Sequence, residues 1–295
     1  MKNIQLIKLY CVICQYYNSR LINDAQRMSN NFCPKFSDEE CITIVLWGIA
    51  NQKFTLKAVY NFIEDFYGNW FPRLPNYQAF DKRVCFLSDA FKSLASILLS
   101  ELDNDFLCMT YLIDSMPIIV AKQKRMKKAK VAPEICDIGY CDSKKMYYYG
   151  VKLHALGQQK YKTLPIPRQM MLTKASPNDL KIGKEMLGDV YKIKLFGDKA
   201  YKDALWEDYI LQNNGIEVFT PVKLKNGESR LNSADKLLST AVSRVRQPIE
   251  SFFNWLQEKT KMEVASKVRS YNGLIAFVFS RIAVSCFMIS NIILV

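Results

Sequence analysis

The spacing of apolar residues changes near residue 105, and this change constrains the fold more than any other feature of the chain. Before it, apolar residues recur at helical spacing over 39–51, 56–67 and 80–99, as in amphipathic helices. Ser37 stands before three acidic residues and fits a helix N-cap. We therefore expect an all-helical N-terminal module over residues 1–105, which is a candidate for DNA recognition or simply a packed bundle.

After residue 105 the pattern favours strands. Residues 108–114 form an apolar, β-prone run, and 146–156 alternate like a half-buried strand. Further strands are expected at 164–173, 193–197 and 216–221, and helices at 177–187, 204–213 and 234–261, the last broken or kinked near Pro248. The order β-β-β-α-β-α-β-α predicts an α/β domain over residues 106–295.

Three carboxylates lie next to apolar segments, where burial of an unpaired charge would be unfavourable unless a metal ion or a cation paired with it. Asp114 ends the first apolar strand, and Asp198 follows the short strand 194–196. If those strands are neighbours, both carboxylates lie at one edge of the sheet. Glu250 lies beside an apolar helical stripe that would pack on the sheet. The simpler interpretation is that the aspartates cap turns and Glu250 is a surface residue.

These three acids offer oxygen ligands only, which suits Mg²⁺ or Mn²⁺. Two such ions can activate an attacking hydroxyl and stabilise the departing oxygen of a phosphodiester. The strand order and the placement of the acids resemble the ribonuclease H fold, a mixed sheet with flanking helices in which two acids on adjacent strands meet a third on a helix.

Four blocks resemble the bacterial insertion-sequence transposases of the DDE class, and the resemblance covers essentially the whole chain. They are LIDSMP at 112–117, YCDSKKMYYYGVKLH at 140–154, GDKAY at 197–201, and Arg246 followed four residues later by Glu250. The resemblance implies a DNA transposase that cleaves insertion-sequence ends and transfers the 3′ ends to target DNA. It also implies that the N-terminal helices recognise the ends and that the protein acts as a homodimer or larger assembly on double-stranded DNA.

By the same resemblance, Asp114, Asp198 and Glu250 are the catalytic residues and hold two Mg²⁺ or Mn²⁺ ions. The chain departs from many relatives at four positions. Ser243 and Gln257 replace a Tyr and a Lys around the third acid, Asn178 replaces a His, and Ala200 replaces a Gly. Two other functions stay open: a catalytically silent DNA-binding descendant, and a structure-selective DNA nuclease of the same fold.

The chain has a formal net charge of +13, which points to a polyanionic partner, either nucleic acid or an anionic membrane. Residues 122–130 contain six cations close behind the first acid, either as a solvated loop or, as we favour, as a DNA contact beside the metal site. The residues expected to bind DNA are Lys124, Arg125, Lys127, Lys128, Lys152, Lys199 and Arg246.

Some residues keep two interpretations. His154 shares a strand face with Lys152 and is either a structural histidine or a neighbour of the active site. Arg246 lies one helical turn before Glu250 and forms a salt bridge or binds a phosphate. Of the three tyrosines at 147–149, at least one is expected in the core.

The C-terminal run 273–295 is long enough to cross a bilayer, but it contains Arg281. A charge at its centre favours a buried terminal helix over a membrane span. Nine cysteines, an odd number, fit reduced thiols rather than a disulfide framework. We expect a protein of the bacterial cytoplasm, associated with the nucleoid and not with a membrane.

Overall fold

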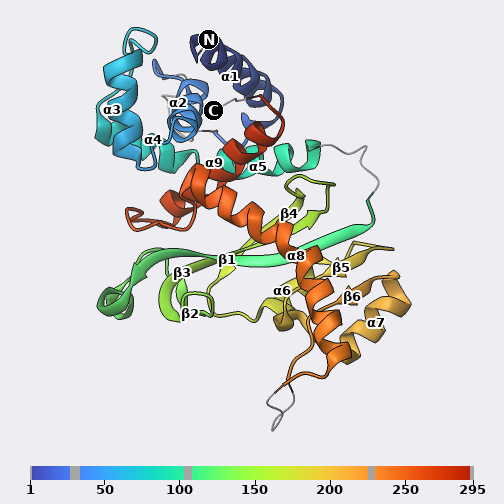
Figure 1. The fold of residues 1–295 in the computed structure, drawn as a ribbon. Helices are drawn as coiled ribbons and strands as arrows, with labels where there is room; N and C mark the ends of the chain where they lie inside the picture. Colours follow the sequence, from blue (N-terminus) through green and yellow to red (C-terminus); the bar gives the residue numbers. More distant parts are fainter. Residues whose placement is uncertain (1, 27–33, 103–107, 225–229, 293–295) are drawn as a thin grey trace. The chain divides into compact units, whose positions relative to one another are not determined.

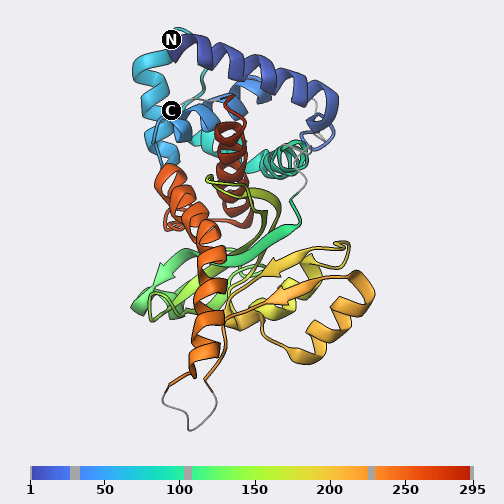
Figure 2. The same cartoon turned by 45° about the vertical axis from the view of Figure 1, so that its right-hand side comes forward.

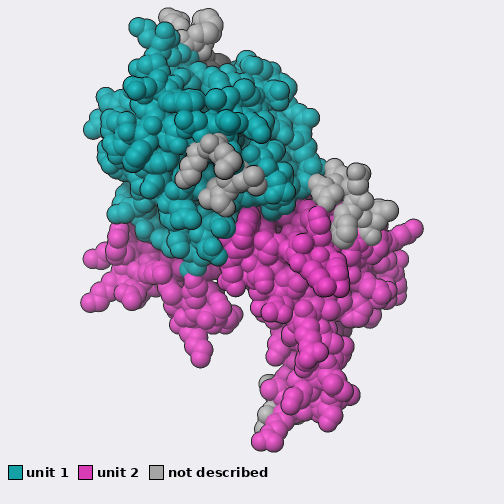
Figure 3. Space-filling view, turned by 45° about the horizontal axis from the view of Figure 1, so that its top comes forward, with its two compact units in different colours: residues 1–102, 130–134, 256–295 teal, residues 103–129, 135–255 magenta. Residues whose placement is uncertain are grey.

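A computed structural model describes residues 2–26, 34–102, 108–224 and 230–292 (Figure 1). The chain forms two compact units, coloured separately in Figure 3. Unit 1 comprises Met1–Leu102, Lys130–Glu134 and Leu256–Val295, and unit 2 comprises Asp103–Ala129 and Ile135–Trp255. The expected division had placed residues 256–295 with the sheet, whereas in the structure they group with the N-terminal helices.

Unit 1 is helical. Its elements are α1 (Lys2–Tyr16), the π-helical turn η1 (Tyr17–Leu21), α2 (Asp38–Ala50), α3 (Leu56–Tyr67), α4 (Tyr77–Phe86), α5 (Ser88–Glu101) and α9 (Tyr271–Ile289). Ser37 caps α2 as predicted: its hydroxyl accepts from the backbone N–H of Glu40, and the Glu40 carboxylate accepts from the N–H of Ser37. The expectation of helices throughout the first hundred residues is confirmed for the part that the structure describes.

Helix α9 explains why the C-terminal residues join unit 1. Within the described ranges it is the one helix long and apolar enough to cross a membrane, and 67% of its most apolar window is buried inside the protein. It packs against α5, α2 and α4. The buried Arg281 donates hydrogen bonds to the carbonyls of Thr260, Phe277 and Phe54, and burial lowers its pKa to about 9. The charge within the apolar run is thus held by backbone oxygens inside unit 1.

Unit 2 is a mixed six-stranded sheet with flanking helices. Its elements are β1 (Thr110–Lys122), the 3₁₀ turn η2 (Gln123–Lys128), β2 (Asp137–Cys141), β3 (Met146–Gln158), β4 (Ile166–Lys174), α6 (Asp179–Met186), β5 (Lys194–Phe196), η3 (Lys199–Tyr201), α7 (Ala204–Asn214), β6 (Glu217–Phe219) and α8 (Ser233–Thr260), whose last residues belong to unit 1. The strand order is β2-β3-β1-β5-β6, and β4 also pairs with β3. This is the ribonuclease H-like fold that we expected.

The sheet combines antiparallel and parallel pairs of strands. Strands β1, β2, β3 and β4 pair antiparallel, whereas β5 pairs parallel with β1 and with β6. Helix α8 crosses one face of the sheet (Figure 2). The other face carries a core cluster that includes Ile113 of β1, Ile182 of α6, Leu195 of β5 and Tyr201 of η3. Successive residues of β1 therefore point to opposite faces, one toward α8 and one toward α6.

Three features differ from the sequence-based expectation. Strand β2 was not predicted, because five residues bounded by loops give a weak alternation signal. Strand β1 does not end at Asp114 but continues to Lys122, since β3 pairs with it along that length. Pro117 is tolerated there because β5 pairs only with Thr110–Leu112, which leaves one side of β1 without a strand partner. Helix α8 continues unbroken through Pro248.

Candidate active site

Each of the two aspartates stands two residues after one member of a paired position on neighbouring parallel strands. Leu112 of β1 is paired with Phe196 of β5, and Asp114 and Asp198 each follow two residues later. Strand β5 turns away after Phe196, at Gly197, where a Cβ atom would lie 3.0 Å from the Tyr201 ring and 3.1 Å from Ile113. Glycine thus permits the close turn that brings Asp198 to the edge where β1 loses its parallel partner.

Backbone N–H groups fix both carboxylates. Asp114 Oδ1 accepts a hydrogen bond of 2.8 Å from the N–H of Ser115. Asp198 caps η3 and accepts from the N–H of Lys199. Their surroundings differ, because the side chain of Asp114 is 21% exposed and that of Asp198 is 50% exposed. Asp114 is therefore the interior member of the pair.

Helix α8 contributes the third acid and a cation. Val242, Arg246 and Ile249 are buried on the face of α8 that packs on the sheet, and Ile249 Cδ1 lies 3.3 Å from the Cβ position of Gly157 in β3. Glu250 lies next to this stripe with a 55% exposed side chain. The helical spacing of the apolar residues thus sets Arg246 over the sheet and Glu250 at its margin.

The Arg246 guanidinium lies among all three acids. Its Nη2 atom is 2.9 Å from Glu250 Oε1 and 3.2 Å from Asp114 Oδ2, and its Nη1 atom is 3.7 Å from Asp198 Oδ1. The Nε atom is buried and has no hydrogen-bond partner among the described residues. One cation therefore lies within ion-pair distance of carboxylates from three separate segments of the chain and offsets part of their charge.

Burial dominates the electrostatics of this site. It raises the pKa of Asp114 from its ordinary value to about 6, although Arg246 and the N–H of Ser115 act in the opposite direction. Burial also raises the pKa of Tyr201 well above its ordinary value, and the negative charges of Asp179, Asp114 and Asp198 add to this effect. The buried Tyr201 hydroxyl has no hydrogen-bond partner among the described residues.

The donor set fits a hard divalent cation. Three carboxylates already surround one positive group, and they supply oxygen ligands alone, as Mg²⁺ and Mn²⁺ prefer. Across the described ranges, no three His, Cys, Asp or Glu side chains approach one another closely enough to form a ready ligand cluster. The acids converge on the Arg246 guanidinium instead, so ions binding to all three would have to replace that group.

The residues expected to bind DNA divide into a group on η2 and a group near the three acids. Lys124, Arg125, Lys127 and Lys128 are exposed on η2. However, η2 follows the far end of β1, about 25–30 Å along the strand from Asp114. The expectation that this segment lies beside the metal site is wrong, because β1 is longer than its apolar run indicated.

The other three cations lie closer to the acids. Lys199 is exposed directly after Asp198. Lys152 is 14% exposed and its ammonium is 2.7 Å from the Asp179 carboxylate. Lys152 and the buried Arg246 are thus both paired with acids within unit 2.

His154 is a buried structural residue in this arrangement. It is completely buried, and its Nε2 atom lies 3.0 Å from the Thr173 hydroxyl. Burial lowers its pKa to about 4, so the ring is neutral at pH 7. The expectation that at least one of the three tyrosines lies in the core is confirmed: Tyr148 and Tyr149 are buried, whereas Tyr147 is 60% exposed.

Sequence reasoning missed Asp179, Ser115 and Tyr201 as neighbours of the site. Asp179 is held by Ser115 and Lys152, and Tyr201 is electrostatically coupled to the aspartates. The signal for Ser115 and Tyr201 was available, since each stands within a few residues of an acid. For Asp179 the signal was the preceding Asn178, where many relatives have a His, but its neighbours in β1 and β3 could not be inferred from that position.

Comparison with protein families gives one finding that bears on this site. The family model described as "Transposase DDE domain" matches residues 107–270, more than half of the chain and all three acids. Comparison with curated proteins finds no match.

Proposed function

The chain belongs to the transposase family defined by the DDE domain, and from this premise we propose that it is a metal-dependent DNA transposase. In this proposal it cleaves phosphodiester bonds at insertion-sequence ends and transfers the 3′ ends to target DNA. The observation that carries the proposal is the convergence of Asp114, Asp198 and Glu250 on one guanidinium. Transposases of this family act on DNA and generally use divalent metal ions.

The three carboxylates are proposed as the ligands of two Mg²⁺ or Mn²⁺ ions. Bound ions would activate the attacking hydroxyl and stabilise the departing oxygen of the phosphodiester. The chain prepares the ligands: the N–H of Ser115 holds one oxygen of Asp114, and the other oxygen faces the centre of the site. The half-exposed Asp198 and Glu250 leave the site open on the side from which DNA would approach.

Arg246 has two successive roles in this proposal. In the first, its guanidinium lies within ion-pair distance of the three acids and offsets part of their charge. In the second, with metal ions held by the carboxylates, the planar guanidinium fork would be available to bind a DNA phosphate, which suits its geometry. Its burial against the sheet supports the first role, and its position one turn from Glu250 supports the second, since the proposed metal ligands would be beside it.

The cations of η2 support a DNA contact away from the cut site. Lys124, Arg125, Lys127 and Lys128 are exposed and form no ion pair with any residue that the structure describes. A base pair of B-DNA extends 3.4 Å, so a duplex that follows β1 would reach η2 about eight base pairs from the cleaved bond. The proposed role of η2 is to hold the flank of the substrate.

Two exposed tyrosines extend this surface. Tyr140 of β2 lies opposite Tyr147 of β3, and their ring centroids are 4.9 Å apart. Lys122 lies opposite Tyr148, so η2 begins beside Tyr147. Exposed aromatic rings next to unpaired cations are typical of nucleic-acid surfaces.

Unit 1 is proposed to recognise the ends of the element, and the active species is proposed to be at least a dimer.

The test uses the full chain and a DNA fragment that carries the ends of its own element. Incubation with Mg²⁺, followed by strand-resolved mapping, should give cuts at the element ends and joined 3′ ends. The Asp114→Asn and Asp198→Asn variants should bind this DNA but leave it uncut. Binding without cleavage by the parent protein would favour the catalytically silent descendant, and cleavage determined by DNA structure rather than by the ends would favour the nuclease.

A further inference from the structure

A second polar network lies on the opposite face of the sheet from Arg246, and it is centred on Asp179. Asp179 begins α6, and its Oδ1 atom accepts a hydrogen bond of 2.7 Å from Lys152 Nζ. Its Oδ2 atom accepts one of 3.3 Å from the Ser115 hydroxyl. Lys152 also reaches the carbonyl of Pro177, at 3.5 Å. The carboxylate is therefore held from both β1 and β3.

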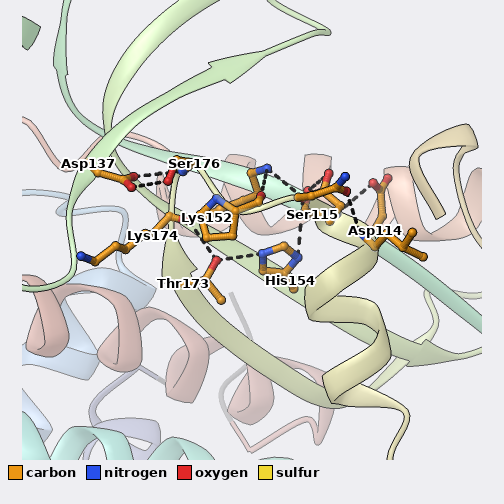
Figure 4. A network of polar contacts seen from close by, with 12 residues as sticks. Asp114, Ser115, Asp137, Lys152, His154, Thr173, Lys174 and Ser176 are labelled. Carbon is orange, nitrogen blue, oxygen red and sulfur yellow. Dashed lines mark hydrogen bonds and ion pairs between the residues drawn. The ribbon is translucent and has the colours of Figure 1, made fainter.

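The strand register explains this placement. Ser115 lies opposite His154, and Pro117 lies opposite Lys152, so these side chains of β1 and β3 share the face toward α6 (Figure 4). Asp114, one residue earlier, points to the α8 face. Ser115 thus belongs to both sites, because its hydroxyl binds Asp179 while its backbone N–H binds Asp114 Oδ1.

His154 and Thr173 form a hydrogen-bonded pair beside the network. The Thr173 hydroxyl donates to the carbonyl of Lys174 at 2.9 Å, so it accepts from His154 Nε2–H. His154 Nδ1 then carries a lone pair and lies 4.0 Å from Asp179 Oδ1. It has no partner among the described residues. A neutral ring beside Asp179 leaves Lys152 as the cation that holds this carboxylate.

We propose that Asp179 is a positioning residue for the reaction: held by Lys152, it fixes Ser115, and Ser115 sets the orientation of the Asp114 carboxylate. The inference rests on the proposed function of Asp114 as a metal ligand. Groups that orient metal-binding carboxylates typically change metal affinity or activity 10- to 100-fold when removed. The Ser115 N–H uses one oxygen of Asp114 and leaves the other directed to the centre of the acids.

The experiment compares Asp179→Asn, Ser115→Ala and Lys152→Met in the full chain. Each should lower kcat for strand cleavage about 10- to 100-fold while KM for DNA changes less than about threefold. Each should also raise, about tenfold, the Mn²⁺ concentration at the midpoint of metal-induced thermal stabilisation. Ser115→Thr keeps the hydroxyl that Ser115→Ala lacks, so its kcat and its Mn²⁺ midpoint should both be close to those of the parent.

The chain offers a matched control in Asp137→Asn. Asp137 accepts hydrogen bonds from the N–H and the hydroxyl of Ser176, so it is also an aspartate bound to a serine at the sheet (Figure 4). It has no contact with Ser115, and its replacement should leave kcat and the Mn²⁺ midpoint unchanged.

The inference fails if Ser115→Ala and Asp179→Asn keep the parental kcat and Mn²⁺ midpoint, or if only the melting temperature falls. A rise in KM with unchanged kcat would also overturn it, because it would assign the network to DNA binding. Failure of the proposed function would give another result. The parent protein itself would neither cleave DNA nor show a Mn²⁺-dependent rise in melting temperature, and Asp114→Asn would behave in the same way as the parent.

Discussion

The guanidinium of Arg246 lies 2.9 Å from the carboxylate of Glu250, one turn further along α8, and the same nitrogen atom is 3.2 Å from Asp114. A cation in this position competes with metal ions for the same oxygens. Arg246→Gln should therefore bind Mn²⁺ about 3- to 10-fold more tightly in the absence of DNA, while the metal-free protein loses about 2 kcal/mol of stability. Titration with Mn²⁺, followed by electron paramagnetic resonance and by melting curves, measures both effects.

Arg244→Gln is the control for that change, since Arg244 is exposed on the same helix. It should alter neither Mn²⁺ affinity nor melting temperature. Unchanged or weaker Mn²⁺ binding by Arg246→Gln would mean that the guanidinium does not occupy the place of the ions.

The raised pKa of Asp114 makes the stability of the metal-free protein depend on pH. Its ordinary value is 3.8 and its folded value is about 6, so between these the folded protein keeps a proton that the unfolded chain has lost. The stabilising contribution is complete below about pH 4 and is lost as pH rises through 6. Asp114→Asn cannot ionise, so relative to the parent it should gain roughly 2–3 kcal/mol between pH 4 and pH 7.5. Denaturant titrations at both pH values check this.

Asp142→Asn serves as the comparison, because Asp142 is exposed in the turn between β2 and β3. Its stability relative to the parent should stay constant over the same pH interval. If Asp114→Asn behaves in the same way, the Asp114 carboxylate is not held in an environment that favours its proton.

The cationic turn predicts a defined salt dependence. Replacing Lys124, Arg125, Lys127 and Lys128 by Gln removes unpaired charges from η2. The slope of log affinity for DNA against log salt should become shallower by roughly 2 to 4, since each phosphate contact contributes about 0.9. Equilibrium binding at several salt concentrations measures the slope. Replacing four exposed lysines elsewhere in unit 2, Lys162, Lys181, Lys192 and Lys236, should have a smaller effect, and equal effects would assign the slope to net charge alone.

The sequence predicted an apolar strand before each of Asp114 and Asp198, because such runs carry a local signal. That these two strands pair was only the condition on which the shared edge of the two carboxylates rested. The sequence also predicted that Arg246 and Glu250 share one side of a helix, which follows from the helical period. The helical relationship depends on residues close together along the chain, whereas the pairing joins strands that are distant in the sequence. The pairing and the ion pair are present in the structure.

The features that the sequence did not reveal depend on distant contacts. Lys152 was among the residues expected to bind DNA, but its ammonium contacts Asp179, which lies on α6. The position of η2 depends on how far β3 extends the pairing of β1. Helix α9 joins unit 1 because α5 and α2 supply its apolar partners. In each case the local sequence pattern predicts the helix, strand or loop, but not the distant residues that it contacts.

Glu250 gives the most direct test of whether the three acids act together. Its side chain is 55% exposed, so Glu250→Gln should leave the melting temperature of the metal-free protein nearly unchanged. It should remove cleavage and most of the Mn²⁺-dependent rise in melting temperature, because a ligand that binds only the folded state raises its stability. Glu258→Gln is the control, as Glu258 lies on the same helix with a 73% exposed side chain and should keep both properties. If Glu250→Gln still cuts DNA and melts with the parental Mn²⁺ shift, Glu250 is only an ion-pair partner of Arg246, and the third ligand of the proposed site belongs to another residue.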